Sequence, residues 1–147
     1  MDKVFDKAVK ALAAMGGAVA GALGGWDALL RVLVAMMAAD YASGVTVAIM
    51  GRSRKIEHGG LSSKVGAEGI LRKGMMLAVV LAASLLDAAM GGGNAMCRDA
   101  ACWFYIANEG LSLLENLGLM GVPFPERLKL LLGQKLEEGG GGDVFDA

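Results

Sequence analysis

Hydrophobic residues gather along the chain in long blocks separated by short polar or charged segments. The blocks cover residues 11–25, 28–50, 74–90 and 100–121. A membrane-crossing helix needs about 20 predominantly apolar residues, so these blocks have the length and character of transmembrane segments. The first block is the weakest because it consists mostly of alanine and glycine. The pattern predicts an all-α membrane protein with three to four transmembrane helices.

Composition supports a membrane protein. Of the 147 residues, 55% are apolar, and the mean hydropathy of +0.52 lies above the range usual for a soluble domain of this size. The net charge of −1 excludes a globally basic nucleic-acid binder, so no nucleic-acid partner is expected. The predicted partner is the lipid bilayer.

The placement of charge predicts the orientation of the spans. The loop 51–73 carries six Lys or Arg residues against two Glu, whereas the link 91–99 carries one Arg. Cytoplasmic loops are enriched in Lys and Arg, so the loop 51–73 and the C-terminus are expected in the cytoplasm and the link 91–99 outside. If block 11–25 crosses, the chain makes four passes with its N-terminus inside, which the N-terminal lysines favour. If it does not cross, three passes leave the N-terminus outside.

Four regions follow from this arrangement. Residues 1–25 form an N-terminal Ala/Gly-rich helix, and residues 26–122 form a core with three spans and the basic loop. Residues 123–138 predict a short interfacial helix, because leucines lie on one face and lysines can reach headgroups. Residues 139–147 predict a flexible acidic tail.

Charged residues inside the spans need a partner or contact with a water-filled cavity, since placing one charged side chain at bilayer depth costs about 3 kcal/mol. With a rise of about 1.5 Å per residue, Arg31 lies about 7 Å, and Asp87 about 6 Å, from the outer ends of their spans. Their matched depth predicts a structural ion pair between Arg31 and Asp87. No basic residue within a span is available at the depths of Asp40, Glu109 and Glu115.

The last span carries a polar stripe along neighbouring helix faces. One interpretation is that these groups hydrogen-bond between helices, with carboxyl groups held neutral. The other is that they line an aqueous lumen once helices assemble, and the sequence favours neither. Together with the carboxylate of the second span, the intramembrane polar residues are Asp40, Asn108, Glu109, Ser112, Glu115 and Asn116.

Small residues recur at fourfold spacing in the first block. Rows of this kind let helix backbones approach closely in membranes and predict a homo-oligomer associating through this segment, although Ala/Gly-rich helices also produce such rows by chance. The row consists of Ala13, Gly17, Gly21 and Gly25.

No pattern of an enzyme or a metal site is found in the sequence. It contains no nucleophile–base pair, no phosphate-cradling loop and no clustered ligand set. We therefore expect a non-enzymatic protein without cofactor or metal.

Several motifs give the chain a resemblance to the toxin-secretion/phage-lysis holin family, which includes clostridial phage holins and holin-like toxin-export proteins. The resemblance runs from Trp26 to Lys135. The matching residues are Trp26-Asp27, Asp40-Tyr41, Ser43-Gly44, Leu61-Ser62-Ser63, Gly69, Lys73, Leu86-Asp87, Tyr105 through Ser112, Glu115-Asn116, Gly118, Gly121-Val122-Pro123 and Pro125.

The resemblance implies a holin of the bacterial inner membrane, which oligomerises and opens holes through which an endolysin or a toxin passes. The polar residues leave two alternatives open. One is a small proton or ion channel, or a transporter subunit, that uses the intramembrane carboxylates as a relay. The other is a non-conducting membrane scaffold or antiholin.

Overall fold

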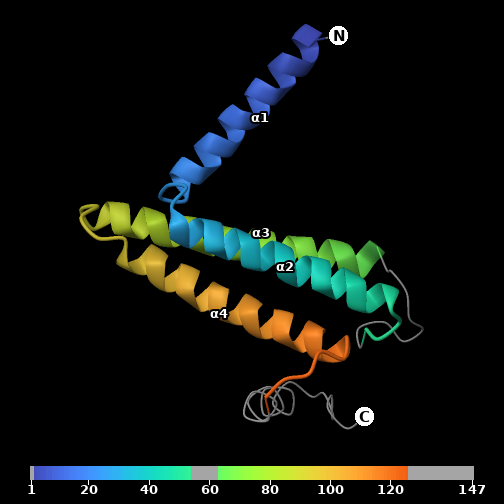
Figure 1. Ribbon diagram of the computed structural model, residues 1–147. Helices are drawn as coiled ribbons and strands as arrows, with labels where there is room; N and C mark the ends of the chain where they lie inside the picture. The colour runs from blue at the N-terminus through green and yellow to red at the C-terminus, as the bar shows by residue number, and fades with distance from the viewer. Residues whose placement is uncertain (1, 54–62, 126–147) are drawn as a thin grey trace. The chain divides into compact units, whose positions relative to one another are not determined.

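The structure, a computed structural model, describes residues 2–53 and 63–125, and these residues form helices and connecting turns without a β-strand. The four helices are α1 (Asp2–Ala22), α2 (Ala28–Ile49), α3 (Ser63–Ala89) and α4 (Met96–Leu119) (Figure 1). By length and composition, α2 and α3 qualify as membrane spans. The all-α prediction is confirmed, whereas the number of three or four spans stays a prediction.

The helix boundaries follow the hydrophobic blocks with two differences. The helix α3 begins at Ser63, so residues 63–73 of the predicted basic loop are helical. The helix α1 begins at Asp2 and includes the charged N-terminal residues. Hydropathy marks only the part of a helix that suits the membrane, and helical hydrogen bonding continues into polar sequence until a residue stops it.

Two predicted regions lie outside the described residues. These are residues 54–62 of the basic loop and nearly all of the C-terminal region, which comprises the predicted interfacial helix 123–138 and the acidic tail 139–147.

Each helix ends in the same way, with a glycine just past its end in the left-handed backbone conformation. In α1 this residue is Gly24, with φ of +88°, and the N–H group of Gly25 donates to the carbonyl of Ala20 at 2.8 Å. This is the Schellman motif, which glycine favours because a Cβ atom makes positive φ costly. The corresponding residues of α2, α3 and α4 are Gly51, Gly91 and Gly121.

The chain divides into two compact units. The first comprises Met1–Val34 and Lys73–Tyr105. Its α3 segment buries one stripe at spacings of four, three and four residues, and the fully buried side chains of the unit come from α2, α3 and α4. The stripe is Met76, Val80, Ala83 and Asp87, and the fully buried side chains are Leu30, Leu33, Val80 and Cys102.

The second unit comprises Ala35–Arg72 and Ile106–Ala147. Its helices approach closely where one of them carries glycine. A Cβ atom at Gly110 of α4 would lie 3.3 Å from the methyl carbon of Met36 in α2. Small residues at contact points let two helix backbones come together in this way.

Candidate functional site

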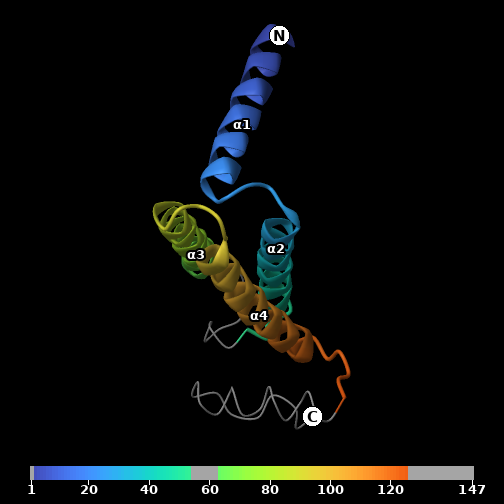
Figure 2. The ribbon, with the colours of Figure 1, turned by 90° about the vertical axis from the view of Figure 1, so that its left-hand side faces the viewer.

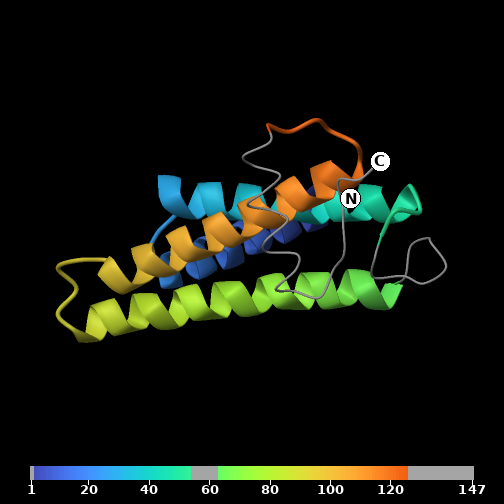
Figure 3. The same cartoon turned by 90° about the horizontal axis from the view of Figure 1, so that it is seen from below.

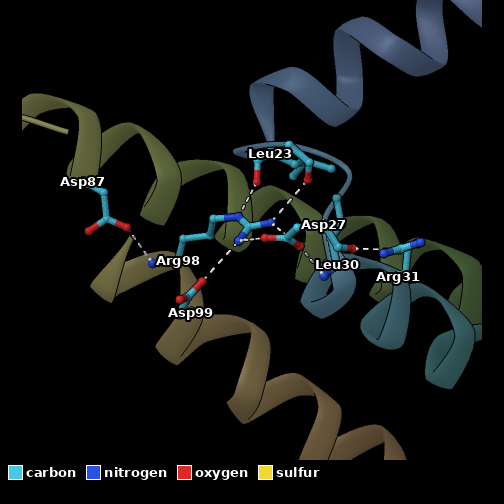
Figure 4. A network of polar contacts seen from close by, with 8 residues as sticks. Leu23, Asp27, Leu30, Arg31, Asp87, Arg98 and Asp99 are labelled. Carbon is cyan, nitrogen blue, oxygen red and sulfur yellow. Dashed lines mark hydrogen bonds and ion pairs between the residues drawn. The ribbon is translucent and has the colours of Figure 1, made fainter. Parts of the chain in front are cut away.

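The polar centre of the first unit is the buried side chain of Arg98, which is 3% exposed. Its guanidinium binds the carboxylate of Asp27 through two nitrogens, at 2.7 and 3.0 Å (Figure 4). The same group donates to the carbonyls of Leu23 at 2.6 Å and Gly25 at 3.3 Å, and to the carboxylate of Asp99 at 3.1 Å. One arginine therefore joins the end of α1, the start of α2 and the start of α4. Figure 2 shows the α1–α2 turn that it holds.

Acidic side chains occupy the N-terminal ends of two helices in this unit. Asp27 caps α2, because its carboxylate accepts the N–H group of Leu30 at 2.9 Å. Asp87, near the end of α3, accepts the N–H groups of Cys97 and Arg98, both at 2.9 Å. These contacts span the turn between α3 and α4, drawn in yellow in Figure 3. The carboxylates satisfy N–H groups that have no partner within their own helix and match the positive end of each helix dipole.

The ion pair shifts the pKa values of both of its members. Hydrogen bonding from the Arg98 guanidinium, helped by the N–H group of Leu30, lowers the pKa of Asp27 to about 2. Conversely, the Asp27 carboxylate raises the pKa of Arg98 above its usual value. At neutral pH both groups are charged, and the pair is a charge-assisted, bidentate contact.

A pH dependence follows from the lowered pKa of Asp27. A carboxylate whose pKa is lowered by folding, here from 3.8 to about 2, stabilises the fold fully above pH 4 and loses this contribution as the pH falls towards 2. We expect the melting temperature of the wild-type protein in detergent to exceed that of Asp27→Asn by a constant amount from pH 7 to about 5 and by less below pH 4.

The control for this titration is the same pair of proteins in an Arg98→Gln background. Removing the guanidinium removes the largest cause of the lowered pKa, so the pH-dependent difference is expected to shrink. An unchanged difference would contradict the role assigned to Arg98.

The structure does not bring together the predicted ion pair of Arg31 and Asp87. Arg31 donates to the carbonyl of Asp27, the capping residue just before its own helix, at 3.2 Å. Asp87 accepts the two N–H groups at the start of α4, and Figure 4 shows the two side chains on different sides of Arg98. The N–H groups satisfy the Asp87 carboxylate without a long side chain having to reach it, which corrects the prediction.

The polar centre of the second unit joins α2 and α4. The side-chain amide nitrogen of Asn116 lies 3.1 Å from a carboxylate oxygen of Asp40 and 2.9 Å from the hydroxyl oxygen of Ser43. The Ser43 hydroxyl donates to the carbonyl of Asp40 at 2.9 Å. Two of the predicted polar residues, Asp40 and Asn116, are therefore in direct contact.

The neighbouring Tyr41 side chain lies against α3 instead. A Cβ atom at Gly66 would lie 3.6 Å from its hydroxyl oxygen, and one at Gly69 would lie 3.6 Å from its ring. Neighbouring residues of α2 thus contact different helices of this unit: Asp40 and Ser43 contact α4, and Tyr41 contacts α3.

The other predicted polar residues of α4 are more buried than solvated. Glu109 is 2% exposed, and Asn108, Ser112 and Glu115 are half-buried. At the end of α4, the guanidinium of Arg52 donates to the carbonyl of Leu119 at 3.2 Å, where a basic side chain suits the helix dipole. In the described part of the chain, no buried side-chain nitrogen or oxygen lacks a hydrogen-bond partner.

The small-residue row of α1 is open to its surroundings. A Cβ atom at Gly17 or Gly21 would meet nothing within 4 Å, and Gly25 lies beyond the helix end. Association through this row stays a prediction. Within residues 2–53 and 63–125, no three His, Cys, Asp or Glu side chains lie together as metal ligands would.

Arg98 is the residue that sequence reasoning missed. As the single basic residue of the link 91–99, it indicated only that this link lies outside. A usable signal was present, because Asp27 and Arg98 both flank the predicted outer ends of spans, and opposite charges at one end of a bundle favour pairing.

Comparison with known proteins agrees with the motifs. The model of the bacteriophage holin family matches residues 17–136. An uncharacterized 14.9 kDa protein of Clostridium perfringens, in the nagH 3′ region, is 37% identical over 134 residues, covering 91% of this chain and 96% of the relative. An uncharacterized Listeria innocua protein is 43% identical over 117 residues, covering 79% of this chain and 78% of the relative.

The "Probable holin" of Bacillus phage phi105 is 42% identical over 65 residues, which cover 44% of this chain and 47% of the phage protein. No solved structure matches the chain. The family resemblance predicted from the motifs is confirmed.

Proposed function

The chain belongs to the bacteriophage holin family, and we propose that it is a holin that oligomerises in the bacterial inner membrane and opens holes for an endolysin or a toxin. The family match over residues 17–136 carries this proposal. The two apolar helices α2 and α3 support insertion into a bilayer. We propose α4 as a further span, with the C-terminus in the cytoplasm and no enzymatic activity.

The polar residues of α2 and α4 supply the chemistry that a hole requires. In a single chain, Asp40, Ser43 and Asn116 satisfy one another, which reduces the cost of placing them at bilayer depth. In an assembly, the same groups can exchange these bonds for bonds to water, because hydrogen bonds between membrane helices contribute only about 0.6 kcal/mol on average. The proposed lumen residues are Asp40, Asn108, Glu109, Ser112, Glu115 and Asn116.

Inducible expression in a bacterium that also makes a cytoplasmic muralytic enzyme tests the proposal. We expect an abrupt loss of membrane potential followed by release of the enzyme and lysis. Without the muralytic enzyme, the potential is expected to collapse while the cell wall stays intact. Selective ion currents without passage of enzyme would instead indicate a channel, and oligomers without permeability would indicate a scaffold or antiholin.

Asn116→Leu tests the lumen assignment. The substitution removes the contacts with Asp40 and Ser43 at a cost of about 1 kcal/mol, so the folded protein should accumulate normally. Lysis is expected to be delayed or lost, because an apolar side chain cannot hold water in the hole. The control is Leu86→Met at a lipid-suited position, 58% exposed, for which lysis should keep its timing. Equal lysis curves for both variants would contradict the assignment of Asn116 to the lumen.

A further inference from the structure

The helix α1 has two chemically different faces. Phe5, Leu12 and Val19 follow one another at intervals of seven residues, which is about two helical turns, and therefore share a face. Lys3, Lys7 and Lys10 lie on the opposite face. An amphipathic helix with lysines on its polar face is typical of segments that lie in the membrane interface.

Nothing in the first unit covers the apolar face. Every residue from 3 to 19 is exposed, and Phe5, Leu12 and Val19 are 73%, 68% and 58% exposed. On the polar face, Lys10 pairs with Asp6 at 2.8 Å, and residues 2–10 carry three lysines against two aspartates, an excess of one positive charge. This face therefore suits anionic headgroups, and the apolar face suits acyl chains.

A transmembrane position suits α1 less well. The apolar stretch after Lys10, residues 11–22, would extend only about 18 Å as a helix, whereas the hydrocarbon core is about 30 Å thick. A crossing would therefore draw Lys10 and Lys7 towards the core, where each charge costs about 3 kcal/mol.

The Arg98 contacts fix the position of the C-terminal end of α1. They hold the carbonyls of Leu23 and Gly25 at the start of α2 and α4. Trp26 follows Gly25 in the chain and Trp103 lies five residues after Arg98, and these two side chains are 57% and 62% exposed. Exposed tryptophans are enriched at the headgroup level, so the C-terminal end of α1 lies at the membrane interface.

We propose that α1 lies flat in the headgroup region at the Arg98 end of the spans, with Phe5, Leu12 and Val19 among acyl chains and the lysines towards anionic headgroups. By the charge distribution of the loops, this end faces outside, so the lipid is that of the outer leaflet. The inference rests on the membrane insertion required by the proposed function and does not depend on hole formation.

Cysteine labelling of the full chain in spheroplasts tests this position. In a background with Cys97→Ala and Cys102→Ala, a single cysteine is introduced as Lys7→Cys or Leu12→Cys, and a membrane-impermeant maleimide is added before the potential collapses. We expect Lys7→Cys to be labelled from outside and Leu12→Cys to be labelled several-fold less. Lys64→Cys, in the predicted cytoplasmic loop, is the control that should react only after permeabilisation.

Each alternative gives a different result. If α1 crosses the membrane, Lys7→Cys reacts only after permeabilisation, and the proposal is overturned. If α1 lies in water, both α1 positions react equally from outside, which also overturns it. Should the expected labelling appear in cells that never lose their membrane potential, the hole-forming function fails while the position of α1 stands.

Discussion

Replacing Arg98 with glutamine is expected to lower the free energy of unfolding by about 3 kcal/mol, the lower end of the range for breaking a buried ion pair. The guanidinium is 3% exposed and binds Asp27 together with the carbonyls of Leu23 and Gly25. Glutamine cannot reproduce the bidentate contact, so the carbonyls lose a charged donor. The Asp27 side chain is 48% exposed and regains water, which keeps the loss near the lower end.

Denaturant titration of the purified protein in detergent micelles measures this loss. Arg31→Gln is the matched control, because Arg31 is exposed and, among the described residues, donates only to the carbonyl of Asp27, the residue just before α2. Its effect should stay within about 0.5 kcal/mol. Equal losses for the two variants would show that Arg98 is an ordinary surface arginine.

The second large effect is expected for Gly24→Ala, at about 3 kcal/mol. Gly24 has φ of +88°, and the left-handed conformation costs a non-glycine residue about 1–2 kcal/mol. In addition, a Cβ atom would lie 2.6 Å from Nε of Arg98, and such overpacking costs about 1–3 kcal/mol. The guanidinium cannot move aside cheaply, because Nε donates to the carbonyl of Leu23.

Gly25→Ala separates the two causes of this loss. Gly25 also has a positive φ, of +110°, but a Cβ atom there would meet nothing within 4 Å. Its loss should therefore reflect backbone strain alone. The same titration gives a third comparison in an Arg98→Ala background, which removes both Nε and Cδ of Arg98, the two atoms that lie 2.6 and 2.7 Å from this Cβ position. There the excess cost of Gly24→Ala over Gly25→Ala should shrink. An unchanged excess would show that the contact with Arg98 is not its cause.

The fold was predictable from sequence where hydropathy decides it. The block 28–50 agrees with α2, because this helix is apolar along its length and glycine stops it. The start of α3 was not predictable in this way. Lys64, Glu68 and Arg72 lower the mean hydropathy of this segment, so it was assigned to the loop. Lysine, glutamate and arginine form helices readily, so their helix propensity extends α3 into a segment that hydropathy does not mark.

The site was predictable in part, for a related reason. Counting depth along the helix predicted Asp40, and helical spacing predicted Asn116, as polar residues inside the spans, and these two are in contact. The same counting paired Arg31 with Asp87, because it considered only side chains within spans as partners. Backbone N–H groups at the start of α4 were the partners of Asp87, and a search among side chains does not include them.

The Arg98 contact also determines an order of assembly during synthesis. Asp27 and Arg98 are 71 residues apart. At about 5–20 residues per second, Asp27 is synthesised about 4–14 seconds before its partner. By the end of this interval α1, α2 and α3 have been synthesised, but the carbonyls at the end of α1 and the Asp27 carboxylate have had no Arg98 to bind. Closure of the first unit therefore waits for the first turn of the last helix, and no nascent chain that stops before α4 can complete it.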